Sequence, residues 1–175
     1  MAYASVVDIM LVLVRDDDHV LLALRRGTGY ADGQWNVPSG KLEDSEHALD
    51  AIVREAREEI GIALEPDDLH LTGVVHCRNP EGEGRVGLFF TTPHRPDRHG
   101  EPVNAEPHKC AELAWYPLDR LPADTVPYIT AGLTLHRTGR PFATIGWDVT
   151  PPARNSDPLP MARPPGPEER ATRTC

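Results

Sequence analysis

The sequence has few cysteines and no apolar run long enough to cross a membrane. Its three cysteines, Cys77, Cys110 and Cys175, are widely spaced, and no pair has the spacing of a zinc site. Such a set implies no disulfide framework, so we expect a reducing, cytoplasmic location. The apolar segment VVDIMLVLV is short, is interrupted by Asp8 and follows no basic segment, which predicts neither a signal peptide nor a transmembrane helix.

An excess of positive charge is also missing. The chain of 175 residues has 18 Lys and Arg against 27 Asp and Glu, a formal net charge of −9. Uniform attraction to nucleic acid or to an anionic membrane is therefore not expected. A negatively charged substrate would need a local basic patch or a bridging metal cation. The length and ordinary composition suit one domain, as a monomer or a homodimer.

Strand and helix patterns alternate along the chain. Two hairpins are predicted, one from VVDIMLVLV and HVLLALRR and one from LHLTGVVHC and RVGLFFTT. WNVPSG, LAWYPL and FATIGWDV predict further short extended segments, and residues 93–112 read as a long polar loop. This interleaving favours the α/β (α+β) class with a mixed sheet.

Two helices are predicted. The first has an apolar face with helical spacing, formed by Leu49, Ile52, Val53, Ala56 and Ile60. Asp44 or Ser45 can cap its start, Glu46 then lies in its first turn, and Gly61 can end it. The second runs from about Thr125 to His136, with Pro127 in its first turn.

The C-terminal segment differs in composition from the rest. Residues 150–175 are rich in proline and charge and have few apolar side chains. We therefore expect a domain over residues 1–149 and a disordered tail after it.

The first predicted helix concentrates negative charge. Glu55, Glu58 and Glu59 fall within an arc of about 100°, where like charges repel. Clustered carboxylates are hard oxygen ligands of the kind that Mg²⁺ or Mn²⁺ prefers, and a cation would relieve the repulsion. The alternative is a solvated acidic face with Arg54 and Arg57 as neighbours.

The spacing around this cluster resembles the Nudix box. Nine fixed or class-restricted positions agree over 23 residues: Gly40, Glu46, Arg54, Glu55, Ala56, Glu58, Glu59, Gly61 and Ile62. GQWNVPSGKLE and ELAWYPLDRLP resemble flanking segments of the family, so the resemblance covers roughly residues 3–148. One position departs from the family pattern, because Ser39-Gly40 stands where Gly-Gly is usual.

This resemblance implies a fold, an activity and a site. The Nudix fold is a mixed sheet between helices, and the family hydrolyses nucleoside diphosphates linked to another group. Glu55, Glu58 and Glu59 would bind Mg²⁺ together with the Gly40 carbonyl, and a glutamate would deprotonate the attacking water. Arg54 would hold the cluster through salt bridges.

Several residues outside the box are further candidates. Arg25, Arg26 and Lys41 could hold phosphates, although surface arginines at a strand end are common. Asn36 could read a base, as an asparagine at this place does in some family members, or could serve only as a turn residue.

The late loop offers one more acid. The family often has a further metal-binding or base glutamate there, for which Glu106 is the candidate and Glu101 and Glu112 are rivals. Trp35 and Cys77 are expected in the core.

We therefore expect a Mg²⁺-dependent pyrophosphohydrolase of nucleoside triphosphates, with a small-molecule nucleotide as its partner. The alternatives are hydrolysis of ADP-ribose or a nucleotide sugar, an isopentenyl diphosphate isomerase, and a non-catalytic nucleotide sensor. The isomerase would need an active-site cysteine and extra metal-binding histidines, and a sensor usually has a broken box or an added domain.

Overall fold

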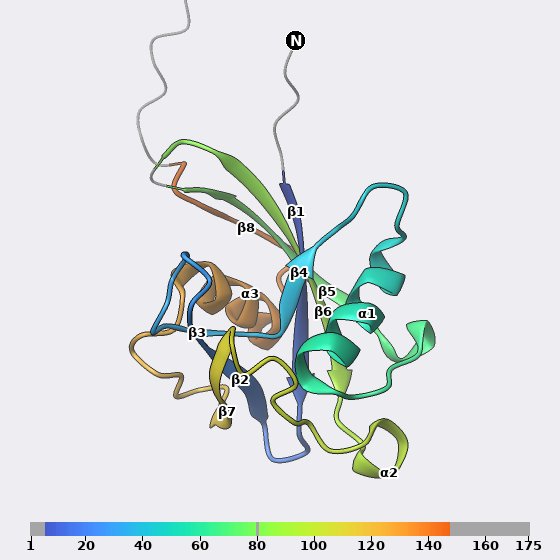
Figure 1. Ribbon diagram of the computed structural model, residues 1–175. Coiled ribbons are helices and arrows are strands. Elements are labelled where there is room, and N and C mark those ends of the chain that lie inside the picture. The colour runs from blue at the N-terminus through green and yellow to red at the C-terminus, as the bar shows by residue number, and fades with distance from the viewer. Residues whose placement is uncertain (1–5, 80, 148–175) are drawn as a thin grey trace, which may run out of the picture.

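In the part of the chain that the structure describes, eight strands form one mixed sheet at the centre of the molecule (Figure 1). The structure is a computed structural model that describes residues 6–79 and 81–147. The strands are β1 (Val6–Val14), β2 (His19–Arg25), β3 (Trp35–Asn36), β4 (Ser39–Lys41), β5 (His70–Arg78), β6 (Gly84–Pro93), β7 (Cys110–Pro117) and β8 (Phe142–Ile145).

The strand order is β3-β2-β1-β6-β5-β8, with β4 paired to β1 and β7 paired to β2. β1 runs parallel to β6 and β5 runs parallel to β8, whereas the other pairs are antiparallel. Both predicted hairpins are confirmed, since β1 pairs with β2 and β5 pairs with β6. The start of β1 pairs with β4 and its end pairs with β2, so β4 is held beside the centre of the sheet.

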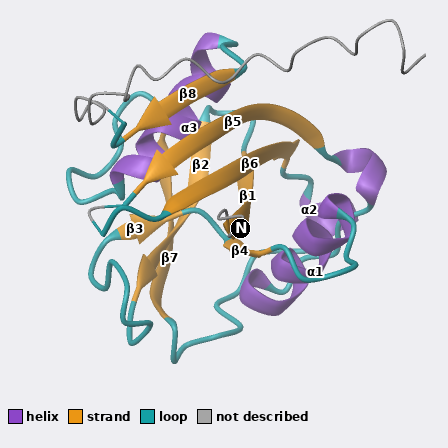
Figure 2. Ribbon diagram, turned by 90° about the horizontal axis from the view of Figure 1, so that it is seen from above, coloured by secondary structure: helices purple, strands orange, loops and turns teal. Residues whose placement is uncertain are grey.

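Helices cover both faces of the sheet, as predicted. α1 (Ala48–Ile60) and α3 (Pro127–Thr138) lie on opposite sides (Figure 2). Alternate residues of β1 serve the two layers: Ile9, Leu11 and Leu13 belong to the core beneath α1, and Met10 and Val12 to the core beneath α3. This period of two is what a strand buried on both faces requires.

The predicted start of α1 was wrong. Ser45 has a φ of 63° and Glu46 precedes the helix, in a turn that its backbone closes to Glu43. The helix is capped by His47, whose side chain accepts a hydrogen bond from the Leu49 amide at 3.2 Å. Glu46 is thereby free to face Arg54 from outside the helix.

The other end of α1 is as predicted. Gly61 is the C-cap with a φ of 68°, a left-handed conformation that glycine adopts without a Cβ clash. The predicted apolar face is also confirmed, because Ile52, Ala56 and Ile60 are buried and the other two residues of that face pack against them.

The long polar loop contains structure that the sequence did not reveal. It includes the short helix α2 (Pro96–His99), and β7 begins within its last residues. α3 starts two residues after the predicted position, with Pro127 in its first turn, and runs two residues further.

In the part of the chain that the structure describes, no helix is long and apolar enough to span a membrane. The predicted tail lies outside the described residues.

Candidate active site

Gly40 on β4 lies directly against α1. A Cβ at Gly40 would overlap the Glu55 carboxylate, so only glycine allows this approach. The neighbouring Ser39 is compatible with it, since its amide donates to Glu59 Oε2 at 2.8 Å. Its hydroxyl accepts from Asn36 Nδ2 at 3.1 Å. Serine in place of the usual first glycine therefore does not prevent the β4 backbone from packing against α1.

Arg54 joins three of the acidic residues. Its Nε and Nη2 donate to the two carboxylate oxygens of Glu46 at 2.8 and 3.0 Å. Its Nη1 donates to Glu55 at 2.6 Å and to Glu58 at 3.4 Å. A bidentate pair with one further close contact fixes the guanidinium plane. Arg54 therefore holds the Glu55 carboxylate in one orientation.

The three glutamates of the cluster lie in different surroundings. Burial raises the pKa of Glu59 to about 8, against the opposing hydrogen bond from the Ser39 amide. Burial also raises the pKa of Glu55, although Arg54 opposes this shift. The Glu58 side chain is 55% exposed. Crowded, partly buried carboxylates hold protons or attract a cation, so this site is suited to positive charge.

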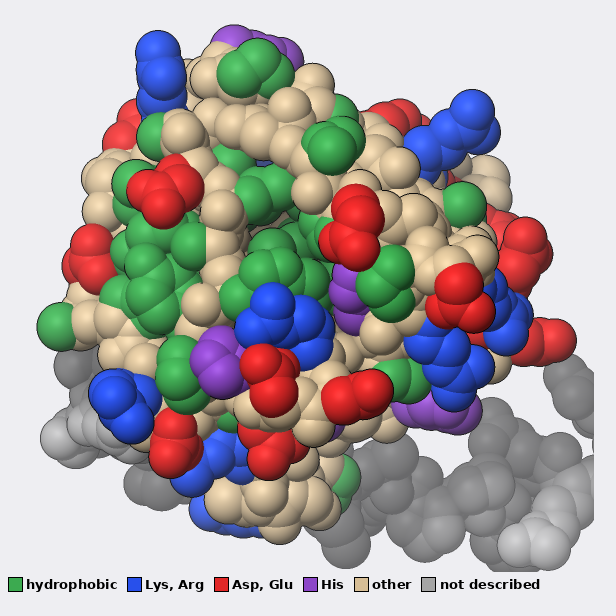
Figure 3. Space-filling model, turned by 90° about the horizontal axis from the view of Figure 1, so that it is seen from below, with side chains coloured by type: hydrophobic (Ala, Val, Ile, Leu, Met, Phe, Trp, Pro, Cys, Tyr) green, Lys and Arg blue, Asp and Glu red, His purple; other side chains and the backbone are tan. Residues whose placement is uncertain are grey.

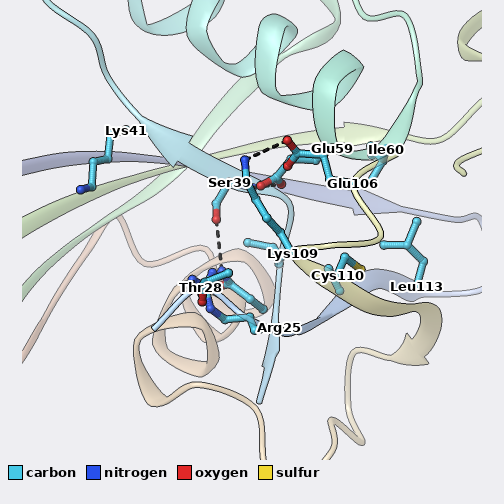
Figure 4. Close-up of a pocket in the computed structure, with 13 residues that line it drawn as sticks. Arg25, Thr28, Ser39, Lys41, Glu59, Ile60, Glu106, Lys109, Cys110 and Leu113 are labelled. Atoms are coloured by element: carbon cyan, nitrogen blue, oxygen red, sulfur yellow. Dashed lines mark hydrogen bonds and ion pairs between the residues drawn. The ribbon is translucent and has the colours of Figure 1, made fainter. Parts of the chain in front are cut away.

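Glu106 joins the cluster from the late loop, whereas its rivals Glu101 and Glu112 are exposed and line no described cavity. The loop docks on the end of α1, because Val103 N donates to the Ile60 carbonyl and Ala105 N to the Glu59 carbonyl, at 3.0 and 3.1 Å. Glu106 then lies beside Glu59 (Figure 4). The charge of Glu106 contributes to the raised pKa values of Glu55 and Glu59.

Within residues 6–79 and 81–147, no three acidic, His or Cys side chains are already gathered as a metal-binding group. Arg54 and the Ser39 amide hold the carboxylates instead. The donors nevertheless fit a hard divalent cation, since they are carboxylates at one helix face with a glycine backbone against them.

Two adjoining cavities open beside the cluster. The first, of about 400 Å³, is lined by Glu59, Glu106, Lys109 and Cys110, among others. The second, of about 580 Å³, is lined by Asp8, Arg85 and Tyr128, among others. Five residues line both: Arg25, Thr28, Asn36, Ser39 and Lys41. The shared lining makes one elongated groove that starts at the glutamates.

Two of the three predicted phosphate-binding residues line this groove. Lys41 extends away from Glu59 and Glu106 (Figure 4), and Arg25 is fixed by bonds to Thr28 Oγ1 and the Tyr30 carbonyl. Arg26 is exposed and lines neither cavity, and its amide donates to the Lys109 carbonyl at 2.8 Å, so the structure does not place its side chain with the site.

The sequence reading missed Lys109. Its Nζ lies 2.8 Å from Glu106 Oε1, and it lines the first cavity. Its position three residues after Glu106 was the available signal. Asp8 and Arg85 were also missed as site residues. A charged residue inside the apolar run of β1 was the signal for Asp8.

Asn36 is nearly buried, with 7% of its surface exposed. Its Nδ2 is engaged by Ser39, while its Oδ1 has no hydrogen-bond partner among the described residues. An unpaired buried acceptor is costly unless a ligand supplies the donor. Trp35 and Cys77 are buried in the core, as predicted.

The face of the molecule seen from below has mixed charge. On this face, Lys and Arg side chains lie among Asp and Glu side chains (Figure 3).

Comparison with known proteins identifies the family. The sequence model of the NUDIX domain matches residues 5–134. CTP pyrophosphohydrolase of Escherichia coli is 31% identical over 145 residues, covering 78% of this chain and 98% of that protein. Oxidized purine nucleoside triphosphate hydrolase of Mus musculus is 31% identical over 123 residues, covering 67% and 70%.

A solved structure agrees with this assignment. The crystal structure of a MutT Nudix hydrolase from Burkholderia pseudomallei has a TM-score of 0.67 to this chain at 30% identity, and the likeness covers 76% of this chain and 98% of that one. The mixed sheet, the box and these relatives agree, and the chain therefore belongs to the Nudix hydrolase family, as an enzyme that hydrolyses phosphoric anhydride bonds.

Proposed function

We propose that this protein is a Mg²⁺-dependent pyrophosphohydrolase that converts a nucleoside triphosphate to a monophosphate and pyrophosphate. The observation that carries the proposal is the groove itself. It joins Glu59, whose pKa is raised by burial, and Glu106 to Arg25, Lys41 and Lys109 in one continuous lining, with Glu55 behind Gly40. Such a site can receive a metal at one end and a chain of phosphates along its length.

The carboxylates of Glu55, Glu58, Glu59 and Glu106 and the Gly40 carbonyl would hold the cation, with Mn²⁺ as a possible substitute. A bound divalent metal neutralises phosphate oxygens and lowers the pKa of water. The partial burial of Glu55 and Glu59 supports this role, because their charges gain most from a cation.

The remaining roles follow from position. Arg54 is a positioning residue that keeps Glu55 and Glu58 on one side of the helix. Glu58 is the most exposed glutamate of the box, so we assign it proton transfer from the attacking water. Arg25, Lys41 and Lys109 would bind the phosphate oxygens that lie further along the groove.

The relatives favour a triphosphate over the alternative substrates. Two relatives are a CTP pyrophosphohydrolase and a hydrolase of oxidized purine nucleoside triphosphates. An isomerase has little support: the Cys110 thiol lines the first cavity but donates to the Glu112 carbonyl, and burial raises its pKa.

A substrate screen tests the proposal. The purified protein is incubated with Mg²⁺ and separately with nucleoside triphosphates, ADP-ribose and a nucleotide sugar, and pyrophosphate and phosphate are measured. Pyrophosphate release from a triphosphate is expected. Turnover of ADP-ribose alone would replace the proposed substrate, and binding without turnover would indicate a sensor.

Asn36 is proposed to contribute to base choice, because its unpaired Oδ1 lies in the groove. Asn36→Ala should change the order in which triphosphates are preferred while the dependence on Mg²⁺ concentration stays the same. An equal loss of kcat/KM for all bases would show that the amide has only a structural role through Ser39.

A further inference from the structure

An ion pair forms the floor of the second cavity. Arg85 on β6 donates through Nε at 2.8 Å and through Nη2 to the carboxylate of Asp8 on β1, and the Tyr128 hydroxyl of α3 donates to the same carboxylate at 3.3 Å. Asp8 is only 4% exposed. Buried ion pairs contribute little net stability compared with apolar residues, so packing alone does not explain why these three residues meet.

The fold makes room for this group. Asp8 lies opposite Gly87 in the β1–β6 register. A Cβ at Gly87 would collide with the Tyr128 hydroxyl, so the strand leaves the space that the hydroxyl occupies. The Asp8 carboxylate is thus bound by both Arg85 and Tyr128.

Arg85 lines this cavity and keeps unused donors. Two of its five N–H groups bind Asp8, and the others have no partner among the described residues. Nη1 and Nη2 form an edge of two parallel donors. Since Asp8 offsets the charge, this edge suits neutral acceptors such as ring nitrogens and carbonyl oxygens rather than a phosphate.

The same cavity offers apolar walls and one buried acceptor that has no partner among the described residues, while Glu81 and Glu83 line it as exposed residues. Asn36 Oδ1 is the unpaired acceptor, and Met10, Val126 and Ile129 are the apolar lining. A planar heterocycle that presents two adjacent acceptors beside one donor would complete this set of hydrogen bonds.

We infer that the second cavity holds the nucleobase and that Arg85, positioned by Asp8 and Tyr128, selects bases with two neighbouring acceptors flanked by an N–H donor. Cytosine presents O2, N3 and its amino group in this order, and guanine presents N7, O6 and N1–H. Uracil and thymine have an N–H between their two carbonyls, and adenine has a single acceptor on each side of its amino group. The inference rests on the proposed function, which puts the metal and phosphates along the groove and assigns base choice to Asn36.

The test compares kcat/KM for CTP, GTP, UTP and ATP in wild type and Arg85→Lys. Lysine keeps a positive charge beside Asp8 but lacks two parallel donors. Wild type should prefer CTP or GTP over UTP by roughly 5- to 150-fold, the range of one bidentate base contact. Arg85→Lys should lose most of this preference and keep its UTP rate. The better of CTP and GTP identifies which base edge is bound.

Arg98→Lys is the matched control. Arg98 also pairs with a buried carboxylate, that of Asp68 at 2.7 Å, and lines neither cavity of the groove. It should leave the ranking of bases unchanged, and melting temperatures of both variants show the cost of changing an Arg–Asp pair. An Arg85→Lys enzyme with the wild-type ranking, or a wild type that prefers UTP or ATP, overturns the inference.

A binding experiment distinguishes failure of the proposed function from failure of this inference. If no triphosphate is hydrolysed, cytidine, guanosine, uridine and adenosine are titrated and binding is followed by calorimetry. Binding of cytidine or guanosine that is lost in Arg85→Lys supports the base site without any hydrolysis. Binding that does not depend on Arg85, or no binding of any nucleoside, contradicts it.

Discussion

Glu58 and Glu59 are adjacent in sequence but differ in exposure and partners. The Glu58 side chain is largely exposed and forms an ion pair with Arg54, whereas Glu59 is partly buried and accepts the Ser39 amide. A substitution at Glu58 therefore separates chemistry from folding more cleanly than one at Glu59.

Glu58→Gln should lower kcat by about 10²- to 10⁴-fold, the range for loss of an acid–base group. Glutamine has nearly the size and helix propensity of glutamate, and it removes repulsion from the neighbouring carboxylates. Without metal the variant should melt at the wild-type temperature or slightly above it. With Mg²⁺ and nucleotide, wild type should gain more stability than the variant, because ligands stabilise the native state that binds them.

Asp50→Asn is the control for this change, since Asp50 is an exposed acid in the first turn of the same helix and is not one of the box glutamates that Arg54 binds. It should keep full turnover. A Glu58→Gln protein with wild-type turnover would remove Glu58 from the metal and base roles, and one that unfolds would mean that the cluster stabilises the fold.

At the scale of elements, the end of α1 and the late loop form one unit. Gly61 ends the helix, and the segment that leads to Glu106 pairs with the last helical carbonyls. A Cβ at Gly61 would lie 2.8 Å from Val103 Cγ2 in that segment.

Gly61→Ala should therefore be more destabilising than Gly139→Ala. Both glycines are left-handed C-caps, with φ values of 68° and 67°, but a Cβ at Gly139 meets nothing within 4 Å. The left-handed conformation alone costs an alanine about 1–2 kcal/mol. Thermal melts should show that cost for Gly139→Ala and a larger one for Gly61→Ala, which should also lose activity through Glu106. Equal melting temperatures would show that the loop yields without cost.

Local patterns predicted most of the elements because the strands and helices carry their own periodicity. The start of α1 was mispredicted because three polar residues, Asp44, Ser45 and His47, could each cap the helix. Which of them caps it depends on the hydrogen bond from Arg54 that holds Glu46 outside the helix. The Nudix box placed the glutamates. Spacing could not predict Arg85, since strand pairing brings it to the groove, whereas the spacing of Lys109 from Glu106 was a signal that was not used.

At the scale of the whole molecule, the C-terminal boundary is a prediction from composition. The last described residue, Trp147, belongs to the domain, because its Nε1 donates to the His76 carbonyl at 3.1 Å and its ring lies 4.4 Å from the His76 ring.

A chain ending at Thr150 should keep the activity and the melting temperature of the full chain, since the residues beyond it have too little apolar surface to offset the entropy of ordering. A chain ending at Gly146 is the comparison and should melt lower, because it lacks the Trp147 contacts. A drop of several degrees in the Thr150 chain would show that the tail packs on the domain.

The register of the sheet places the two ends of the described chain in one row. Val6 pairs with Arg85, Arg85 with Cys77, and Cys77 with Ile145. Three strand spacings separate the outer two, about 14 Å. A short linker could therefore join them, and the exposed turn Asp16–Asp18 could supply new ends. A circular permutant built this way should fold to the same sheet and keep the groove, because strand pairing rather than chain order holds the glutamates and Arg85 in place.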